Sequence, residues 1–377
     1  MLVMTPPMGY NTWNTFGYDI NADLIKETAD AMVREGLLEA GYKYLVIDDC
    51  WSELERDPKT DKIIPDHIKF PKGMKDVSDY VHSKGLKFGM YSCAGVRTCA
   101  DFPGSFDHEF LDAQTFAEYG CDFLKYDFCH CPQNIDGRLL YRRMGVALRN
   151  CGREILYSAC NWGVDNSGSW MRATGADMYR STGDIIDNFK SFSDILLSQQ
   201  HNVGYSGPCC FNDLDMLTVG MYGKGNVGSS GCNDIDYKTQ FALWCMFGSP
   251  LMIGCDVRHM TPEAKALLTN KNLIALNQDP DCCPPYEVAS NRWNSRMKSF
   301  IRHLSNNEFA IGFFNMADEA DGIPFFSFNA GLDVSCDYGF ALTDMFTGED
   351  AGLLEEFTYP VIQAHDCALY RAKIVKL

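Results

Sequence analysis

Residues 44–51 read Tyr-Leu-Val-Ile-Asp-Asp-Cys-Trp, a run of apolar side chains that ends abruptly in two carboxylates. Such a run favours a strand that is buried on both faces, as in a parallel sheet. The same theme recurs along residues 1–280, where a short run rich in Val, Ile, Tyr or Phe precedes a polar turn and an amphipathic helix. This alternation is typical of parallel βα units.

Seven further runs fit the pattern, which brings the predicted strands to eight. They cover residues 8–13, 88–91, 123–126, 155–158, 178–181, 203–206 and 251–254. Helical spacing lies between them, for example at Ile25, Ala29 and Met32 after an Asn21 cap. Eight parallel strands with helical crossovers predict an α/β fold, a (β/α)8 TIM barrel, as a catalytic domain over residues 1–280.

The pattern changes after Asn277-Gln-Asp-Pro280. Alternating apolar residues at 309–314 and 368–374 replace the helical spacing, and turn clusters occur at 305–307 and 318–322. We therefore expect a smaller C-terminal antiparallel β domain over residues 281–377.

Composition limits the function. The 377 residues are 46% hydrophobic and carry a net charge of −17, which excludes a disordered chain and disfavours binding to nucleic acid or an anionic membrane. Residues 241–255 are apolar but are interrupted by Gly248, Ser249 and Pro250, so we expect a buried barrel segment rather than a membrane span. The opening residues have no basic or apolar segment of the secretory kind, and the 17 cysteines then suggest mostly reduced thiols. A cytoplasmic location is expected.

Carboxylates follow the predicted strands at an unusual frequency. They are Asp48, Asp49, Asp127, Asp184, Asp213 and Asp215. In a barrel the C-terminal strand ends surround one cavity, where several carboxylates would repel one another unless a ligand or a reaction required them. Either a divalent metal or a pair of acid/base carboxylates with others bonding substrate hydroxyls explains such a set.

The second explanation fits the sequence better. A Mg²⁺ or Mn²⁺ site usually accompanies phosphate-binding features that this sequence lacks, so no metal and no cofactor are predicted. Glycoside hydrolysis needs two carboxyl groups flanking the scissile bond. Aromatic residues at the same strand ends would give apolar faces to a sugar ring, although each alone is equally explained by core packing. They are Trp13, Trp51, Tyr91 and Trp162.

Five motifs in order carry a resemblance that covers nearly the whole chain. They are Pro-Pro-Met-Gly-Tyr-Asn-Thr-Trp at 6–13, Ile-Asp-Asp-Cys-Trp at 47–51, Leu-Lys-Tyr-Asp at 124–127, Tyr-Arg-Ser-Thr-Gly-Asp at 179–184 and Asn-Asp-Leu-Asp-Met at 212–216. The chain resembles glycoside hydrolase family 27, most closely an intracellular bacterial-type α-galactosidase. The resemblance implies a barrel followed by an antiparallel β-sandwich and a retaining hydrolase that releases terminal α-D-galactose from small oligosaccharides or glycoconjugates without a metal.

The resemblance also implies roles for single residues. Asp127 is the expected nucleophile and Asp184 the general acid/base, with neighbouring negative charges raising the pKa of Asp184. The substrate-binding set comprises Trp13 as the floor, Asp48 and Asp49 at the 4- and 6-hydroxyls, Lys125 beside them, Tyr91 near the nucleophile, Arg180 on the 2-hydroxyl side and Asp215 facing the ring. Lys125 is equally explained as an ion-pair partner of Asp127. Asp213 is explained as a brace of its own loop.

The loop at 160–163 bears on which sugar is accepted. Asn161 stands where related α-galactosidases usually carry Glu, at the position facing the 2-substituent, and the bulky Trp162 is expected to fill the space that an acetamido group would need. The resemblance further implies a disulfide between Cys99 and Cys129. It leaves Cys50 and Cys160 without their usual partners, as free buried thiols.

Other interpretations stay open. Residues 223–228 read Gly-Lys-Gly-Asn-Val-Gly and match a dinucleotide fingerprint, but no strand leads into them, so a loop at the barrel mouth is favoured. An α-N-acetylgalactosaminidase, a β-L-arabinopyranosidase, a transglycosylase and a catalytically silent sugar-binding protein are the alternatives on the same scaffold. Assembly into a homo-oligomer is also left open.

Overall fold

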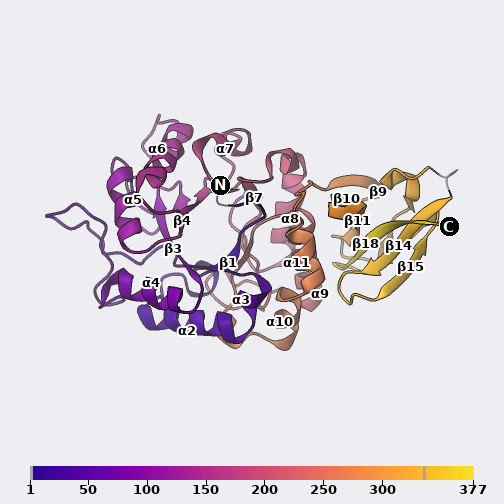
Figure 1. The fold of residues 1–377 in the computed structure, drawn as a ribbon, viewed down its shortest axis with the longest axis horizontal. Helices are drawn as coiled ribbons and strands as arrows, with labels where there is room; N and C mark the ends of the chain where they lie inside the picture. The colour runs from indigo at the N-terminus through magenta and orange to yellow at the C-terminus, as the bar shows by residue number, and fades with distance from the viewer. Residues whose placement is uncertain (1–2, 292, 334–336) are drawn as a thin grey trace.

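The computed structural model describes residues 3–291, 293–333 and 337–377. Figure 1 shows a barrel of strands ringed by helices and, beside it, a separate sheet formed by the C-terminal part of the chain. The barrel sheet has eight strands in the order β7-β6-β5-β4-β3-β2-β1-β8. A parallel bridge between Leu217 and Ile253 links the segment after β7 to β8 and closes the ring. The predicted (β/α)8 barrel is confirmed.

The barrel strands are short and almost wholly buried, as expected where helices cover the outside of a parallel sheet. They are β1 Met8–Asn11, β2 Tyr44–Val46, β3 Lys87–Cys93, β4 Phe123–Asp127, β5 Leu156–Cys160, β6 Met178–Arg180, β7 Phe211–Asp213 and β8 Leu251–Ile253.

Helices connect these strands, and polar side chains cap several of them. The backbone N–H of Leu24 donates to the Asn21 side chain at the start of α2, as predicted. Asn233 and Asp236 form a capping box at the start of α9. The helices are α1 Trp13–Phe16, α2 Ala22–Arg34, α3 Leu37–Ala40, α4 Gly73–Ser83, α5 Glu109–Glu118, α6 Gly137–Asn150, α7 Met171–Thr174, α8 Phe189–Gln199, α9 Asp234–Met246, α10 Pro262–Leu268 and α11 Lys271–Asn277.

The seventh strand is not where the sequence predicted it. Residues 203–206 lie at the end of a 3₁₀ helix, η2 (Gln200–Tyr205), and β7 comprises Phe211–Asp213. Asn202 Nδ2 donates back to Gln199 Oε1, in the last turn of α8, at 2.8 Å. The true strand was missed because a single Phe precedes Asn212 and Asp213, which is too short an apolar run to recognise.

The C-terminal part forms an antiparallel sheet of six strands in the order β15-β14-β18-β11-β10-β9. Asn306 and Asn307, both with positive φ, turn the chain between β10 and β11, as the turn cluster predicted. Two short strand pairs, β12 with β17 and β13 with β16, add to it. The strands are β9 Tyr286–Asn291, β10 Asn294–Leu304, β11 Glu308–Asn315, β12 Asp321–Gly322, β13 Phe325–Phe326, β14 Tyr338–Asp344, β15 Asp350–Leu354, β16 Phe357–Thr358, β17 Val361–Ile362 and β18 Cys367–Lys376. The division after residue 280 stays a prediction, and it falls between the end of α11 and the start of β9.

Helix α9 joins the two parts. Lys238 Nζ donates to Asp366 Oδ1 at 2.7 Å, and Thr239 Oγ1 donates to the His365 carbonyl at 2.7 Å. From β10, Arg302 Nη1 donates to the Cys245 carbonyl at 2.9 Å, in the last turn of α9. The Arg302 side chain is buried, and this burial lowers its pKa below the usual value. The C-terminal sheet therefore places a buried cation where the helix dipole favours one.

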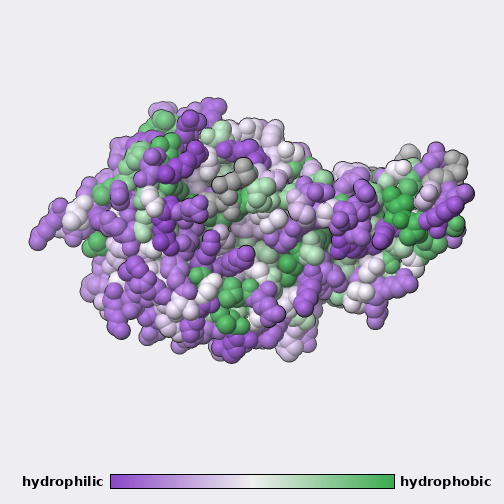
Figure 2. Space-filling view, in the orientation of Figure 1, coloured by the Kyte–Doolittle hydropathy of each residue, from purple (hydrophilic) through white to green (hydrophobic). Residues whose placement is uncertain are grey.

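The face of the molecule seen in Figure 2 is mostly polar. Figure 2 shows hydrophilic side chains over the visible face of the barrel and a hydrophobic patch over the C-terminal sheet. Within the described part of the chain, no helix combines the length and the apolar character that crossing a bilayer requires.

Candidate active site

Strand geometry brings the predicted site residues together. Side chains alternate along a strand, so Lys125 and Asp127, two positions apart in β4, point the same way, toward the barrel axis. The strands end around one cavity, and eleven of the thirteen residues predicted for the site line it. They are Trp13, Asp48, Asp49, Tyr91, Cys99, Lys125, Asp127, Trp162, Arg180, Asp184 and Asp215.

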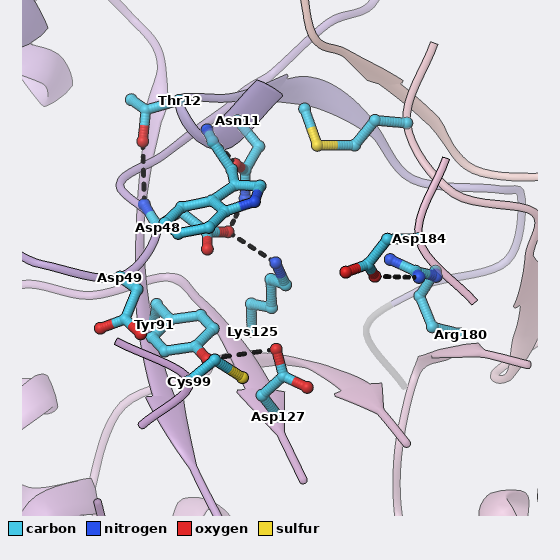
Figure 3. A network of polar contacts seen from close by, with 12 residues as sticks. Asn11, Thr12, Asp48, Asp49, Tyr91, Cys99, Lys125, Asp127, Arg180 and Asp184 are labelled. Carbon is cyan, nitrogen blue, oxygen red and sulfur yellow. Dashed lines mark hydrogen bonds and ion pairs between the residues drawn. The ribbon is translucent and has the colours of Figure 1, made fainter. Parts of the chain in front are cut away.

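A hydrogen-bonded group fixes Asp48 after β2. Lys125 Nζ lies 2.8 Å from Asp48 Oδ2, and Asn11 Nδ2 donates to the same oxygen at 2.6 Å. The backbone N–H of Asp48 donates to Thr12 Oγ1 (Figure 3). Lys125 therefore pairs with Asp48 and not with Asp127, against the simple ion pair that the sequence left open. Burial lowers the pKa of Lys125, but the charges of Asp48 and Asp127 and the hydrogen bond to Asp48 together outweigh burial and raise the pKa, so the amine stays protonated.

Asp127 lies at the closed end of the cavity. Tyr91 OH donates to Asp127 Oδ2 at 3.1 Å, and the backbone N–H of Phe128 donates to Oδ1 at 3.0 Å. Burial raises the pKa of Asp127 above its usual value, while the positive charge of Lys125 opposes that rise. The result is a buried carboxylate held in one orientation by two donors.

Arg180 at the end of β6 holds two carboxylates. Its Nη2 lies 2.7 Å from Asp184 Oδ1, and its Nη1 lies 2.9 Å from Asp215 Oδ1. Asp215 also accepts the backbone N–H groups of Ile185 and Met216, each at 2.7 Å. These contacts hold Asp215 at a φ of 80°, a left-handed backbone conformation that is costly for a residue other than glycine.

Asp184 differs from Asp127 in its surroundings. Its side chain is 72% exposed at the cavity mouth, whereas Asp127 is 6% exposed. The enclosing protein raises the pKa of Asp184, but the charge and hydrogen bond of Arg180 outweigh this effect, so the pKa lies below the usual value. The sequence-based expectation of a raised pKa was therefore wrong, because it counted the neighbouring acids and not the arginine.

Two other acids near the cavity have raised pKa values. Burial raises the pKa of Asp49 to about 6, against hydrogen bonds from the backbone N–H groups of Cys50 and Ala100. Burial also raises the pKa of Asp213 to about 7, while the charge of Arg180 opposes it. Asp213 lies beneath the cavity and accepts the backbone N–H of Asp215 at 3.0 Å, which agrees with its predicted function as a brace.

Asn161 does not line the cavity. Its side chain is 1% exposed, Nδ2 donates to the Val164 carbonyl at 3.1 Å, and Oδ1 accepts the Gly163 N–H. The amide is thus used to shape its own loop, since Asn is too short to reach past that turn. Asn161 therefore does not face the cavity where its contact with the 2-substituent was predicted, whereas Trp162 does reach the cavity, with a positive φ of 58°.

Four lining residues were not predicted from the sequence. Asn14 directly follows Trp13, and Val227 lies within the Gly-rich motif at 223–228. Ile185 and Met216 directly follow the predicted acids Asp184 and Asp215. Adjacency to a predicted acid was the signal that could have identified the latter two. Residues 223–228 form a loop at the barrel mouth, where Asn226 Nδ2 donates to the Trp13 carbonyl. The segment that matches a dinucleotide fingerprint is therefore not placed directly between the strand and the helix that such a fingerprint requires.

Cys99 and Cys129 are joined in a disulfide beside the cavity. Tyr91 OH lies 3.3 Å from Cys99 Sγ, so the disulfide contacts the same tyrosine that bonds Asp127. Among the described residues, fourteen other cysteines are free, Cys50 and Cys160 included. Trp51, proposed as a sugar-contacting aromatic, is buried and donates its Nε1–H to the Tyr91 carbonyl, so it supports the site from behind.

Two clusters in the described part of the chain bring together three side chains of metal-ligating types. One comprises Cys99, Asp127 and Cys129, and the other Glu53, Asp66 and His67. In the first cluster both sulfurs belong to the disulfide and cannot act as thiolates. In the second, the His67 ring already bonds Glu53 and Asp66 accepts two backbone N–H groups, so each side chain has a local structural function.

Comparison with known protein families agrees with both parts of the fold. Residues 5–279 match the family model described as alpha galactosidase A, and residues 295–372 match the alpha galactosidase C-terminal beta sandwich domain. Alpha-galactosidase 3 of Arabidopsis thaliana is 39% identical over 370 residues, covering 98% of this chain and 82% of that protein. Alpha-galactosidase A of Cellvibrio japonicus is 40% identical over 332 residues, covering 85% of this chain and 77% of that protein.

Solved structures give the same result. Alpha-galactosidase I from Mortierella vinacea superposes with a TM-score of 0.90 at 30% identity, covering 98% of this chain and 97% of that one. The Saccharomyces cerevisiae α-galactosidase solved with raffinose gives a TM-score of 0.89 at 26% identity, covering 99% and 98%. A Geobacillus stearothermophilus β-L-arabinopyranosidase at 22% identity shares the fold, with a TM-score of 0.87.

A barrel with paired carboxylates in one polar cavity, followed by a C-terminal β domain, is typical of a glycoside hydrolase. The chain belongs to the α-galactosidase family, glycoside hydrolase family 27, and hydrolyses α-galactosides.

Proposed function

We propose that the chain is a retaining exo-α-galactosidase in which Asp127 is the nucleophile and Asp184 the general acid/base. The observation that carries the proposal is the contrast between these two carboxylates in one cavity. Asp127 is buried and oriented by Tyr91 and the Phe128 N–H, while Asp184 stands at the open mouth. A nucleophile must be held still, and an acid/base must reach both the leaving group and water.

The reaction proceeds in two displacements. Asp127 attacks the anomeric carbon and forms a β-galactosyl ester as the C–O bond to the aglycone breaks, and Asp184 gives its proton to the departing oxygen. Water then loses a proton to Asp184 and attacks the ester from the opposite face, which regenerates both carboxyl groups and releases α-galactose. Tyr91 and the Phe128 N–H stabilise the negative charge on Asp127 before attack and after release.

Arg180 has two states in this scheme. In the unliganded site it bonds Asp184, which keeps that carboxyl ionised. A substrate hydroxyl that accepts the hydrogen bond of Arg180 Nη2 in place of Asp184 would release Asp184 to bind a proton. Nη1 would remain paired with Asp215. Binding of the sugar is thereby coupled to protonation of the acid.

The cavity lining favours galactose. Asp48 with Lys125, and Asp49 beside them, offer charged hydrogen-bonding groups for the 4- and 6-hydroxyls, and a site built to bond a hydroxyl rejects a sugar lacking it. This argues against an arabinopyranoside. Trp162 occupies the wall on the side of the 2-substituent, which leaves little space for an acetamido group and argues against N-acetylgalactosamine.

A cytoplasmic location is also proposed, with imported small oligosaccharides as substrates. It is supported by the fourteen free cysteines of the described chain, since an oxidising compartment would drive pairing of thiols. Fractionation of the source cells followed by immunoblotting tests it, and enzyme confined to a secreted fraction would overturn it.

Proton NMR of the first product from nitrophenyl α-galactoside tests the mechanism. α-Galactose must appear first, before mutarotation, and initial formation of β-galactose would remove Asp127 from the role of nucleophile.

A further inference from the structure

Residues 222–232 form a loop at the barrel mouth, between β7 and α9. The loop contains the Gly-Lys-Gly-Asn-Val-Gly segment at 223–228, to which the proposed mechanism gives no function. Val227 lines the catalytic cavity and, like Ile185 and Met216, brings an apolar side chain to a largely polar lining. The loop therefore supplies part of the wall around the catalytic carboxylates.

Two glycines let the loop pack closely. Gly225 has a φ of 85°, and a Cβ there would lie 2.9 Å from the carbonyl oxygen of Asn14. A Cβ at Gly228 would lie 2.4 Å from the carbonyl oxygen of Gly223. Neither position accepts a side chain unless the backbone moves, so close packing of the loop explains these glycines without a bound phosphate.

Backbone hydrogen bonds hold the middle of the loop from two sides. The Asn226 N–H donates to the Thr15 carbonyl, and the Val227 N–H donates to the Asn14 carbonyl, each at 3.1 Å. On the other side, the Asp187 N–H donates to the Val227 carbonyl at 3.0 Å. Val227 is therefore fixed between the segment that follows β1 and the segment that follows β6.

Asp187 also bonds both ends of the loop. It is 0% exposed, its Oδ2 accepts the Gly223 N–H at 2.7 Å, and its carbonyl accepts the Gly231 N–H at 3.0 Å. Cys232 hydrogen-bonds the carboxylate as well, and the Tyr237 hydroxyl in α9 lies 3.0 Å from both of its oxygens. A buried carboxylate needs such donors, and it fixes them in one arrangement in return.

The segment that contains Asp187 also contains catalytic groups. Asp187 follows Asp184 by three residues, and Ile185 between them donates its N–H to Asp215 Oδ2 at 2.7 Å. Asp187 itself does not line the cavity, whereas Ile185 does. Any effect of the Asp187 carboxylate on a bound sugar must therefore pass through the residues that it holds.

We propose that Asp187 is a positioning residue for sugar binding, which holds residues 222–232 so that Val227 completes the wall of the catalytic cavity. This inference rests on the proposed function, because it takes the cavity of Asp127 and Asp184 as the galactose site. An apolar wall contacts the C–H groups of the sugar before and during the reaction alike. It therefore contributes to the binding of substrate and of product rather than to the bond-breaking step.

The first test removes the carboxylate. Asp187→Ala is expected to raise KM for nitrophenyl α-galactoside and the inhibition constant of galactose by at least about fivefold, with kcat changed by less than about twofold. A merely structural role would not give this result, because a smaller folded fraction lowers the apparent kcat and leaves KM unchanged.

Asp279→Ala is the matched control. Asp279 is also buried, its carboxylate also accepts a backbone N–H and a hydroxyl, both from Ser305, and it does not line the cavity. This variant should lose stability, but its KM and its inhibition constant must stay within about twofold of the wild-type values.

A double-mutant cycle tests whether the effect passes through Val227. Val227→Gly alone should raise both constants. Asp187→Ala should then add less than about twofold, because the side chain that Asp187 positions is already absent. Effects of the two substitutions that multiply in full would show that Asp187 acts by another route and would overturn the proposal.

Tyr237→Phe is a second variant, used if Asp187→Ala fails to fold. It keeps Asp187 but removes the hydroxyl that bonds both carboxylate oxygens, and it is expected to raise both constants by at least about threefold. Unchanged constants in whichever of the two variants folds would overturn the proposal. A wild-type enzyme that releases no nitrophenol would instead overturn the proposed function itself.

Discussion

Arg180 and Asp184 form an ion pair with Nη2 2.7 Å from Oδ1, although the proposed mechanism requires a proton on Asp184 in its first step. We predict that in the free enzyme Asp184 titrates below about 3.9, the usual value for Asp. The measurement is ¹³C NMR titration of carboxyl-labelled enzyme, with Asp184→Asn identifying the resonance. Arg180→Lys should raise this pKa, since a single ammonium cannot keep both carboxylates in place. Arg143→Lys is the control, because Arg143 also bonds two carboxylates far from the site. A resonance titrating above the usual value would contradict the ion pair.

Removal of each catalytic carboxylate should have a different signature. Asp127→Ala is expected to abolish turnover of every substrate, whereas Asp184→Ala should lose about 10²- to 10⁴-fold on raffinose and far less on a nitrophenyl leaving group. Azide should then give β-galactosyl azide with Asp127→Ala and α-galactosyl azide with Asp184→Ala. Equal losses on both substrates in Asp184→Ala would show that another group provides the proton.

Asp213 makes the stability of the enzyme depend on pH. Its pKa in the folded chain is about 7, so the folded state keeps a proton that the unfolded state releases near pH 4. The folded state binds more protons in this window, and its stability therefore falls as pH rises from about 4 to about 7. Asp213→Asn removes this dependence while retaining the oxygen that accepts the Asp215 N–H.

Thermal unfolding at pH 5 and pH 8 measures the effect. From pH 5 to pH 8 the Tm of the wild type should fall by roughly 2–4 °C more than the Tm of Asp213→Asn. Asp49 and Asp177 have pKa values of about 6 and act in the same direction, but they are common to both proteins and cancel. The exposed Asp337→Asn is the control. Parallel Tm curves would mean that Asp213 is ionised throughout.

The disulfide should stabilise both the fold and the site. Cys99 and Cys129 are 30 residues apart, and a loop of that size corresponds to roughly 3–4 kcal/mol in the chain-entropy model. Cys99→Ser/Cys129→Ser should lower the urea midpoint and also kcat, since Tyr91 contacts both Cys99 and Asp127. Cys209→Ser/Cys283→Ser, which changes two free and partly exposed thiols, should do neither. Loss of stability without loss of kcat would separate the disulfide from the orientation of Tyr91.

Sugar selectivity can be tested at two residues. kcat/KM for nitrophenyl α-galactoside should exceed that for the α-N-acetylgalactosaminide and for the β-L-arabinopyranoside. Asp49→Ala should lower the preference over the arabinopyranoside by at least about tenfold, because the 6-hydroxyl loses its partner. Trp162→Ala should raise relative activity on the acetamido sugar. If the wild type prefers either of the other two sugars, the assignments of Asp49 and Trp162 are wrong.

Much of the fold and the lining of the site followed from local sequence. Apolar runs predicted seven of the eight barrel strands. The aspartates that follow some of these runs placed carboxylates around the cavity, because parallel strands all end on one side of a barrel. The exception, β7, consists of Phe211, Asn212 and Asp213, and has too few apolar residues to distinguish it from a loop.

The sequence could not predict which of several nearby groups each site residue bonds in the folded chain. Lys125 is two residues from Asp127 but pairs with Asp48, 77 residues away, because both reach the barrel axis at one level. Asn161 lies in the right loop but turns back upon it. The pKa of Asp184 is lowered where a rise was expected, because Asp184 forms an ion pair with Arg180 in the folded loop after β6.

Arg302 has a consequence for how this architecture can be inherited. Its guanidinium comes from the C-terminal sheet and satisfies carbonyls at the end of a barrel helix, in a place that water does not reach. A sheet grafted from an unrelated enzyme without that cation would cover those carbonyls and leave them without a donor. Recombination at the junction between distant genes would therefore tend to yield less soluble chimeras, unless the incoming sheet also brought a cation to this place.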